Sequence, residues 1–474
     1  MKKWFALMMV VVVGLSAVLA GCSSGTNQET NTKEPKVLRV AGEGEDWIRN
    51  EWVTYFQVAN PNVEVEFVDI DPYRNHRGRW SSTNEERPDP VQEVIKELED
   101  HPVDLVILNN QSMMQALIDN GIVQPLDTFM KQDQGFNLDQ MVPAVRDKLQ
   151  GMGNGTLYTI SPTFDTYVLA YNKEMFDRFN QPYPTDNMTW DDLFTLGENF
   201  NEGEGIEATY GVSLGDSWEI SQYINIYAAQ LGLNPVDLDT KTAYLNTPEW
   251  RELWSMFADA YEQKKIARPV RYEDYIDAGY SEDQIPWSRT PFHGNLAAMG
   301  VMTLQDVSRL EDTFKYDRNA KKFAYDIVAF PSPSSNTNMG APIRLEWFFA
   351  VPTNSSNAST AWDFISFNMS AKMMEVKGRS RGMLGTVEEY MIPTSMELNK
   401  QAFTTRTETP ELNRIFDYSS YDPTLDKVRE IAWNGEMYFN QVIEGMLTVD
   451  EALEKYQEDA ERTLANLEAE DQDQ

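Results

Sequence analysis

The sequence predicts an α/β protein of two lobes. Short apolar runs typical of strands alternate with segments whose apolar residues recur at helical spacing, beginning with a strand at Val37–Ala41, a helix at Trp47–Val58 and a strand at Val63–Ile70. Such alternation indicates βαβ units and a mainly parallel sheet. At 474 residues the chain is too long for one hydrophobic core. Its 41% apolar and 12% aromatic content is typical of a globular protein.

The first half continues this pattern with a helix at Val91–Leu98, a buried strand at Asp104–Leu108 and a helix at Ser112–Asn120. In parallel sheets, ligands bind beyond the carboxyl ends of the strands. We therefore expect Gly42–Trp47 and Asn109–Gln111 to lie on the same rim. The segment Tyr73–Asp89 between them is polar and basic, and we interpret it as an insertion on that rim.

The stretch 154–190, NGTLYTISPTFDTYVLAYNKEMFDRFNQPYPTDNMTW, predicts a crossing between the lobes. A polar turn is expected at Thr163–Thr166, with Asp165 exposed on it and directed at a ligand. The apolar run Tyr167–Tyr171 then predicts a core strand of the second lobe. The Pro/Ser/Asn-rich segment Pro331–Pro342 is a candidate second crossing.

The second half of the chain also alternates predicted strands and helices. Helices are expected at Trp190–Phe200, Glu219–Leu231, 247–264, Ala361–Asn368 and Thr448–Leu467, and strands at Tyr210–Leu214, Leu296–Met302, Phe323–Phe330 and Trp347–Val351. Asn234–Asn246 predicts a β-hairpin. Its Asp237 and Asp239 leave calcium binding open as an alternative, although their spacing falls short of an EF-hand loop.

The N-terminus predicts export followed by anchoring. Lys2 and Lys3 precede an apolar run, and the segment ends in Leu-Ala-Gly-Cys22, which resembles the bacterial lipobox. Cleavage would remove residues 1–21 and leave a lipidated (palmitate-type) Cys22 on the outer face of the cell membrane, followed by a flexible tether over residues 22–35. Cys22 is the single cysteine, so no disulfide within the chain is expected.

The net charge of −35 argues against a nucleic-acid partner, because the overall field repels phosphate. Gly211-Val-Ser213-Leu-Gly215 matches a nucleophile elbow, but Ser213 lies within a predicted strand rather than on a turn. Three separate histidines and no further thiol make a zinc site unexpected. We expect no cofactor, no metal and no catalytic residue, while chance pairs among 75 acidic residues leave glycoside hydrolysis open.

The aromatic side chains say more about the class of ligand. Trp side chains can stack on the apolar faces of sugars, while carboxylates and amides bind hydroxyl groups. Candidates for ligand contact are Trp47, Trp218 with Asp216, Trp287, Trp347, Trp433, and the amides of Asn109, Asn110 and Gln111. Arg344 could bind a carboxylate or pair with Glu346. Four other tryptophans lie in apolar stripes at helical spacing and are expected in the core: Trp52, Trp250, Trp254 and Trp362.

Several motifs, in order, resemble the family 1 extracellular solute-binding proteins of ABC importers. They are VDLVILNNQSMMQALIDNGIVQPLD, GTLYTISPTFDTYVLAYNKEMF, MTWDD, FHGNLAAMGV, DIVAFPSP, STAWDFISF and TVDEALEKYQED. The resemblance as a whole extends over roughly residues 37–467. The resemblance implies a two-lobed fold like that of the type II periplasmic binding proteins, with a ligand cleft between the lobes and crossing strands that let them close.

The resemblance also implies site residues. Glu43, Asn109–Gln111, Asp165, Asp216–Trp218 and Trp433 fall where maltose-binding-protein-like members contact their ligand. Such members carry a tryptophan after the Ala-Met strand, but this sequence has Thr303–Gln305 near that position. The resemblance therefore does not imply specificity for maltose.

We therefore expect a lipid-anchored, monomeric binding protein that captures a small molecule and delivers it to an ABC permease. An oligosaccharide is the favoured ligand. Alternatives are the same fold binding a peptide or an anionic solute, and an anchored polysaccharide-active hydrolase. The first lobe is expected over 36–163 with about 332–385, and the second over 164–331 with about 386–474.

Overall fold

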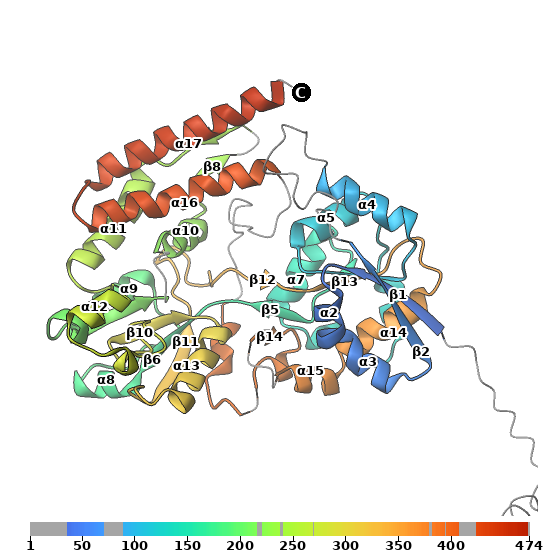
Figure 1. Cartoon of the computed structure of the whole chain (residues 1–474), viewed down its shortest axis with the longest axis horizontal. Coiled ribbons are helices and arrows are strands. Elements are labelled where there is room, and N and C mark those ends of the chain that lie inside the picture. The colour runs from blue at the N-terminus through green and yellow to red at the C-terminus, as the bar shows by residue number, and fades with distance from the viewer. Residues whose placement is uncertain are drawn as a thin grey trace, which may run out of the picture.

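The computed structural model describes residues 36–70, 89–215, 220–237, 240–268, 270–378, 382–393, 395–406 and 423–472. It has two groups of strands and helices joined by a small sheet (Figure 1). No helix in these ranges is both long and apolar enough to cross a membrane. Some predictions lie outside them: the signal segment, the tether with Cys22, residues 73–88, Asp216, Trp218 and Asp239.

The first lobe is built on a five-stranded sheet with the order β2-β1-β3-β13-β4. Its strands are β1 (Lys36–Gly42), β2 (Val63–Asp69), β3 (Leu105–Leu108), β13 (Phe348–Ala350) and β4 (Thr159–Ile160). β1 pairs in parallel with β2 and β3, whereas β13 runs antiparallel to β3 and β4. All of β3 is buried, as its uninterrupted apolar run predicts.

Helices flank this sheet. They are α2 (Glu45–Ile48), a π-helix (Arg49–Val53), α3 (Thr54–Ala59), α4 (Pro90–Asp100), α5 (Gln111–Asp119), α6 (Asp127–Gln132), α7 (Pro143–Met152), α14 (Ala358–Asn368) and α15 (Ala371–Gly378), with 3-10 turns at Leu138–Gln140 and Glu388–Tyr390. The predicted helix at Trp47–Val58 thus exists but contains a π-helical turn. Short π-helices within α-helices are often found at functional sites.

The second lobe is built on a four-stranded sheet with the order β11-β6-β10-β7. Its strands are β11 (Tyr325–Ala329), β6 (Val168–Asn172), β10 (Ala297–Met302) and β7 (Tyr210–Leu214). β6 is antiparallel to both of its neighbours, and β10 is parallel to β7. A separate hairpin of β8 (Val236–Asp237) and β9 (Thr242–Ala243) confirms the one predicted at Asn234–Asn246.

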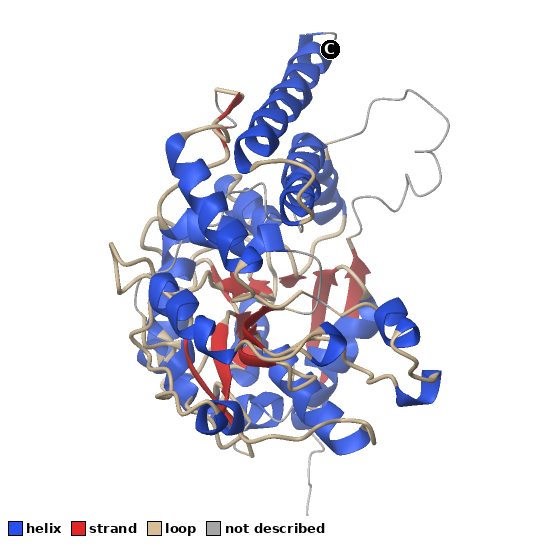
Figure 2. Cartoon of the chain, turned by 90° about the vertical axis from the view of Figure 1, so that its left-hand side faces the viewer, coloured by secondary structure: helices blue, strands red, loops and turns tan. Residues whose placement is uncertain are grey.

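Helices enclose the strands of this lobe too (Figure 2). They are α8 (Lys173–Arg178), α9 (Trp190–Gly197), α10 (Ile220–Gln230), α11 (Pro248–Glu262), α12 (Tyr272–Asp277), α13 (Leu304–Tyr316), α16 (Pro423–Ile443) and α17 (Val449–Gln472), with 3-10 turns at Glu198–Phe200, Gly205–Glu207, Glu282–Gln284 and Lys400–Phe403. α16 and α17 pack together above α10 and α11 (Figure 1).

A three-stranded antiparallel sheet lies between the lobes; we call it the hinge sheet. Its order is β12-β5-β14, with β5 at Thr163–Asp165, β12 at Arg344–Leu345 and β14 at Leu384–Gly385. The predicted polar turn at Thr163–Thr166 is therefore wrong, because Thr163–Asp165 is the middle strand of this sheet. The second crossing passes through β12, directly after the predicted linker.

The prediction of two lobes, each a sheet flanked by helices, is confirmed, but the sheets are mixed rather than mainly parallel. The reason is the path of the chain. β6 and β13 both follow directly from hinge strands, so each enters its sheet from the hinge side and runs against its neighbours.

Aromatic side chains fill both cores, and the four tryptophans assigned to the core are buried there: Trp52, Trp250, Trp254 and Trp362 are 0%, 2%, 1% and 5% exposed. Trp52 packs edge-on against Phe349 at 5.2 Å in the first lobe. Trp254 packs edge-on against Phe439 at 5.2 Å in the second. Pairs of this geometry contribute about 0.5–1.5 kcal/mol each beyond the area they bury.

Candidate functional site

In both large sheets, the ends of the strands on one side face the hinge sheet. We call these two rows of strand ends the hinge-facing edges. The chain passes from β4 to β5, from β5 to β6 and from β12 to β13 through two-residue links, so the ends of these strands adjoin the hinge. Phe348 of β13 pairs with Leu108, and Val168 of β6 pairs with Met302. The carboxyl ends of β1 and β3 in one lobe and of β7 and β10 in the other therefore lie at these edges.

Three charged residues cluster on the hinge sheet. Arg344 pairs with Asp165 across β12 and β5, and its Nη2 lies 3.1 Å from Asp165 Oδ2. Its Nε donates to Glu346 Oε1 at 2.9 Å. We call these three residues the hinge triad. Two carboxylates share one guanidinium, which confirms the pairing of Arg344 with Glu346 that the sequence left open.

Asp165 is more enclosed than the sequence predicted. Its side chain is 14% exposed, against 71% for Arg344. Burial raises the pKa of Asp165 to about 7, and although Arg344 opposes this shift, Glu346 and Asp306 add to it. The expectation of an exposed carboxylate on a turn is therefore wrong. Asp165 is the last residue of the middle strand of the hinge sheet and pairs with Arg344 of β12.

The hinge-facing edge of the first lobe carries an exposed aromatic ring. Trp47 on α2 is 51% exposed and lies 6.1 Å from Trp347, with the two ring planes tilted by 49°. Trp347 in turn contacts Trp52 edge-on at 6.3 Å. Because Trp347 is only 3% exposed, it supports Trp47 and does not itself present a face to a ligand. The prediction of Trp347 as a direct contact is corrected accordingly.

The support beneath Trp47 includes a buried cation. Lys377 on α15 lies 4.1 Å above the ring of Trp52, and its Nζ also binds the side chain of Glu51 in the π-helix at 2.5 Å. A desolvated cation over an indole ring contributes about 2 kcal/mol. The contact ties α15 to the turn that follows Trp47.

Polar residues follow the strands that end at the same edge. Glu43, which directly follows β1, and Asn109, which follows β3, are exposed, and Gln111 is half-buried at the start of α5. Asn110 differs, since it is buried and its Oδ1 accepts from the backbone N–H of Met113 at 2.7 Å. Its side-chain oxygen is the N-cap acceptor of α5, so burial and this bond both argue against the predicted contact of Asn110 with a ligand.

The matching edge of the second lobe lies under α16. Glu436 of α16 accepts from the backbone N–H of Ser221, at the start of α10, at 2.8 Å. Burial raises the pKa of Glu436 despite this bond. Trp433 is one turn earlier on the same side of the helix and is 68% exposed. α10 follows the carboxyl end of β7, so Trp433 lies near that strand end.

Trp287 does not belong with these residues. Its backbone N–H donates to Asp317 Oδ2 at 2.9 Å, and Asp317 directly follows α13. α13 begins after the carboxyl end of β10 and is 13 residues long, about 20 Å. Trp287 therefore lies at the outer end of the lobe, away from the hinge. Trp287 was a candidate because it lies at the start of a loop. That position does not distinguish the hinge end of a lobe from its outer end.

Other residues at the edges escaped the sequence analysis. Tyr167, between β5 and β6, accepts a hydrogen bond from Gln222 at its hydroxyl at 2.8 Å. Met437, four residues after Trp433, is 44% exposed; its i, i+4 spacing from Trp433 was a usable signal. Ser213 lies within β7, 1% exposed, which confirms that it is not on a nucleophile elbow. The described residues hold no cluster of His, Cys, Asp and Glu suited to a metal ion.

The structure has two α/β lobes joined by hinge strands, and exposed aromatic and polar side chains lie at the strand ends beside the hinge. This arrangement is typical of two-lobed binding proteins. The chain belongs to the family of bacterial extracellular solute-binding proteins, whose model matches residues 82–389. Membership places it on the extracytoplasmic side.

Solved structures share the fold over most of the chain. A sugar transporter from Rhizobium etli in an open conformation is 19% identical, with a TM-score of 0.60 over 90% of this chain and 98% of that one. The sugar-binding protein MalE of Xanthomonas citri is 13% identical, with a TM-score of 0.59 over 93% and 100%. The cyclic alpha-maltosyl-1,6-maltose binding protein of Arthrobacter globiformis is 15% identical, with a TM-score of 0.56 over 91% and 100%.

Proposed function

We propose that this protein captures an oligosaccharide between its two lobes, closes around it through the hinge sheet and delivers it to an ABC permease. The observation that carries the proposal is the pair of exposed indoles, Trp47 and Trp433, near the hinge-facing edges of opposite lobes. Indole faces stack on the apolar faces of sugar rings, and a ligand held by both rings would bridge the lobes.

Polar contacts would come from Glu43, Asn109 and Gln111 in the first lobe, and from Asp165 at the hinge. Carboxylates and amides accept and donate the hydrogen bonds that hydroxyl groups require. We propose that Asp216 and Trp218, which follow β7, complete the site from the second lobe. The lobes themselves would comprise 36–163 with about 332–385, and 164–331 with about 386–474.

The charge of the hinge favours a neutral ligand over an anionic one. Arg344 is already held by Asp165 and Glu346, so an anion would have to displace a carboxylate from it. Neighbours of the same fold bind carbohydrates or sugar alcohols: a Listeria monocytogenes protein is in complex with cycloalternan, and an Agrobacterium vitis protein has D-mannitol bound.

Closure would follow from ligand binding alone. A ligand shifts the open and closed populations only by its difference in affinity for the two states, and contacts with both lobes exist only in the closed state. We further propose that lipid on Cys22 anchors the protein, as a monomer, to the outer face of the membrane.

A thermal-shift screen of the mature protein against oligosaccharides, monosaccharides, peptides and carboxylates tests the proposed ligand class. We expect oligosaccharides to raise the melting temperature, because a ligand at one hundred times its Kd stabilises by about 2.7 kcal/mol. A rise with peptides or carboxylates only would contradict the sugar proposal. Release of reducing sugar from polysaccharides in many turnovers would replace it with the hydrolase alternative.

A further inference from the structure

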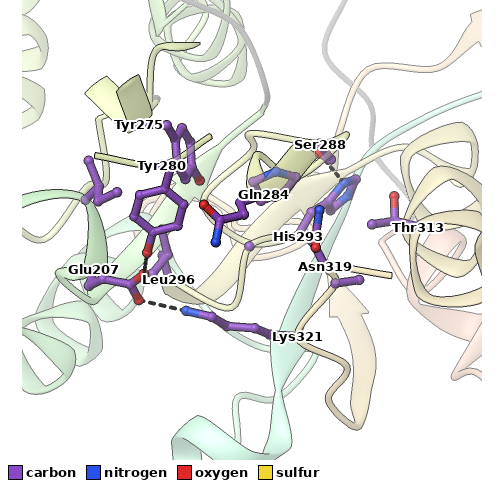
Figure 3. Close-up of a pocket in the computed structure, with 14 residues that line it drawn as sticks. Glu207, Tyr275, Tyr280, Gln284, Ser288, His293, Leu296, Thr313, Asn319 and Lys321 are labelled. Carbon is purple, nitrogen blue, oxygen red and sulfur yellow. Dashed lines mark hydrogen bonds and ion pairs between the residues drawn. The ribbon is translucent and has the colours of Figure 1, made fainter. Parts of the chain in front are cut away.

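A separate cavity lies at the outer end of the second lobe, away from the hinge. It has a volume of about 70 Å³ and opens beside the start of β10 and the end of α13 (Figure 3). Its floor is buried: His293, Leu296 and Thr313 are 5%, 6% and 7% exposed. None of the residues that line it belongs to the hinge-facing edges.

The ionic groups of this cavity neutralise one another. Glu207 binds Lys321 Nζ at 2.7 Å through one carboxylate oxygen and the Tyr280 hydroxyl at 2.6 Å through the other. Lys321 and Tyr280 lower the pKa of Glu207, so the carboxylate stays ionised at neutral pH. On the floor, Ser288 Oγ lies 2.8 Å from His293 Nδ1. The charged groups of the cavity are thus already paired with each other, which favours a neutral ligand over an ion.

Three uncharged polar groups remain available around the same space. Gln284 uses its Oε1 to accept from Ser281, which leaves the two N–H donors of its Nε2 without a partner in the described part of the chain. Asn319 uses its Nδ2 to donate to the backbone of Asp283, leaving its Oδ1 as an acceptor. The Thr313 hydroxyl can do both. Figure 3 shows Gln284 beside Tyr280 and Asn319 beneath His293, among the residues that line the cavity.

The walls between these groups are apolar or aromatic. Tyr275 and Tyr280 pack edge-to-face, with ring centroids 5.4 Å apart, and Leu296 adds apolar surface to the lining. A donor, an acceptor and a hydroxyl spaced around apolar surface are suited to a molecule whose carbon chain carries hydroxyl groups.

Size limits the ligand further. A water molecule needs roughly 10–15 Å³ of such volume, and a dry cavity of about 150 Å³ takes a benzene molecule. The 70 Å³ here admit a group of a few heavy atoms but no whole sugar chain. We propose that this cavity is a second binding site for a neutral polyhydroxyl group, either a free polyol of glycerol size or the hydroxymethyl end of a larger sugar.

The test uses two substitutions that keep the local structure. Gln284→Glu retains a side-chain oxygen that accepts from Ser281, as Glu commonly does in a capping box, but replaces the amide donor by an acceptor. Thr313→Val keeps the shape and removes the hydroxyl. The matched control is Gln132→Glu with Thr360→Val, which makes the same changes on an exposed position of α6 and a buried position of α14.

Saturation-transfer NMR on the full mature chain measures binding of glycerol, erythritol, methyl glucoside and maltose. We expect the Gln284→Glu/Thr313→Val variant to bind at least tenfold more weakly than wild type and the control to match wild type. Loss confined to glycerol and erythritol identifies free polyols as the ligand, and loss confined to the glycosides identifies sugar ends. Equal binding by wild type and variant, or no saturation transfer from any of the four probes, overturns the proposal.

Urea unfolding of both variants is measured alongside, which distinguishes a loss of folding from a loss of binding. The interlobe site provides a second control. The variant is expected to keep wild-type affinity for whichever oligosaccharide stabilises the protein in the thermal screen, so failure of either site is seen independently of the other.

Discussion

Two strands that are neighbours in the sequence, β5 and β6, belong to sheets of different kinds. β5 (Thr163–Asp165) ends on a carboxylate held by a largely exposed arginine. β6 (Val168–Asn172) is buried at all five positions and lies between β10 and β11. Thr163 and Phe164 of β5 are buried as well, but β5 belongs to a sheet of three short strands whose ion pair reaches water at Arg344, whereas β6 is enclosed by longer strands on both sides. The lobes are therefore expected to be rigid and the hinge sheet adaptable.

The largest expected effect is on the buried strand. Leu169→Asn should destabilise the protein by about 3–5 kcal/mol, because it removes a fully buried side chain and leaves an amide without a partner. Urea unfolding gives the value. Val58→Asn is the control, since Val58 is 78% exposed and its replacement should stay within about 0.5 kcal/mol. Equal small effects of both changes would remove the distinction between β5 and β6.

The next effect concerns pH at the hinge triad. Asp165 holds its proton to about pH 7 in the folded state, against a pKa of 3.8 unfolded, so between these values the folded state binds more protons. The stabilisation is complete below about pH 4 and is lost as the pH rises through 7. Wild type should therefore lose up to about 4 kcal/mol relative to Asp165→Asn between pH 4 and 8.

Asp133→Asn provides the control for that pH profile. Burial opposes ionisation of Asp133, but hydrogen bonds from Ser366, Gly135 and Trp362 lower its pKa overall. Its contribution to stability is therefore present above the unfolded pKa of 3.8 and lost only at lower pH. Urea midpoints measured at pH 4.5, 6 and 8 should diverge from wild type for Asp165→Asn and stay parallel for Asp133→Asn. Parallel curves for both variants would contradict the protonation of Asp165.

A smaller effect is expected on binding at the hinge. Asp165→Ala should weaken oligosaccharide affinity about tenfold, equivalent to about 1.4 kcal/mol, because one hydrogen-bonding group is lost and Arg344 is released from one partner. Calorimetry with the stabilising oligosaccharide measures it. Asp139→Ala, at an exposed acid on a 3-10 turn of the first lobe, is expected to keep wild-type affinity. Unchanged affinity of Asp165→Ala would remove this residue from the site.

The smallest effects separate the tryptophans. Trp47→Ala and Trp433→Ala should each reduce affinity by about 1 kcal/mol through the loss of one stacking face. Trp287→Ala, at the outer end of the lobe, should leave it unchanged. A loss of affinity with Trp287→Ala alone would show that the ligand does not bind between the lobes.

The sequence was sufficient for features that depend on local pattern. Periodicity placed Trp52, Trp250, Trp254 and Trp362 in the core, and the run at Tyr167–Tyr171 predicted the buried strand β6. It was insufficient where the partner is distant in sequence. Asp165 was expected on a turn because its strand is only three residues long, and its partner Arg344 lies 179 residues away. The outer cavity combines segments near 207, 284, 293 and 319, which no local pattern connects.

The central claim is that a sugar ligand closes the two lobes around the hinge sheet. Small-angle X-ray scattering of the mature protein, titrated with the oligosaccharide that gives the largest thermal shift, tests it most directly. The radius of gyration is expected to fall in a saturable manner, with the midpoint at the calorimetric Kd. A radius that stays constant while calorimetry reports full binding would contradict closure.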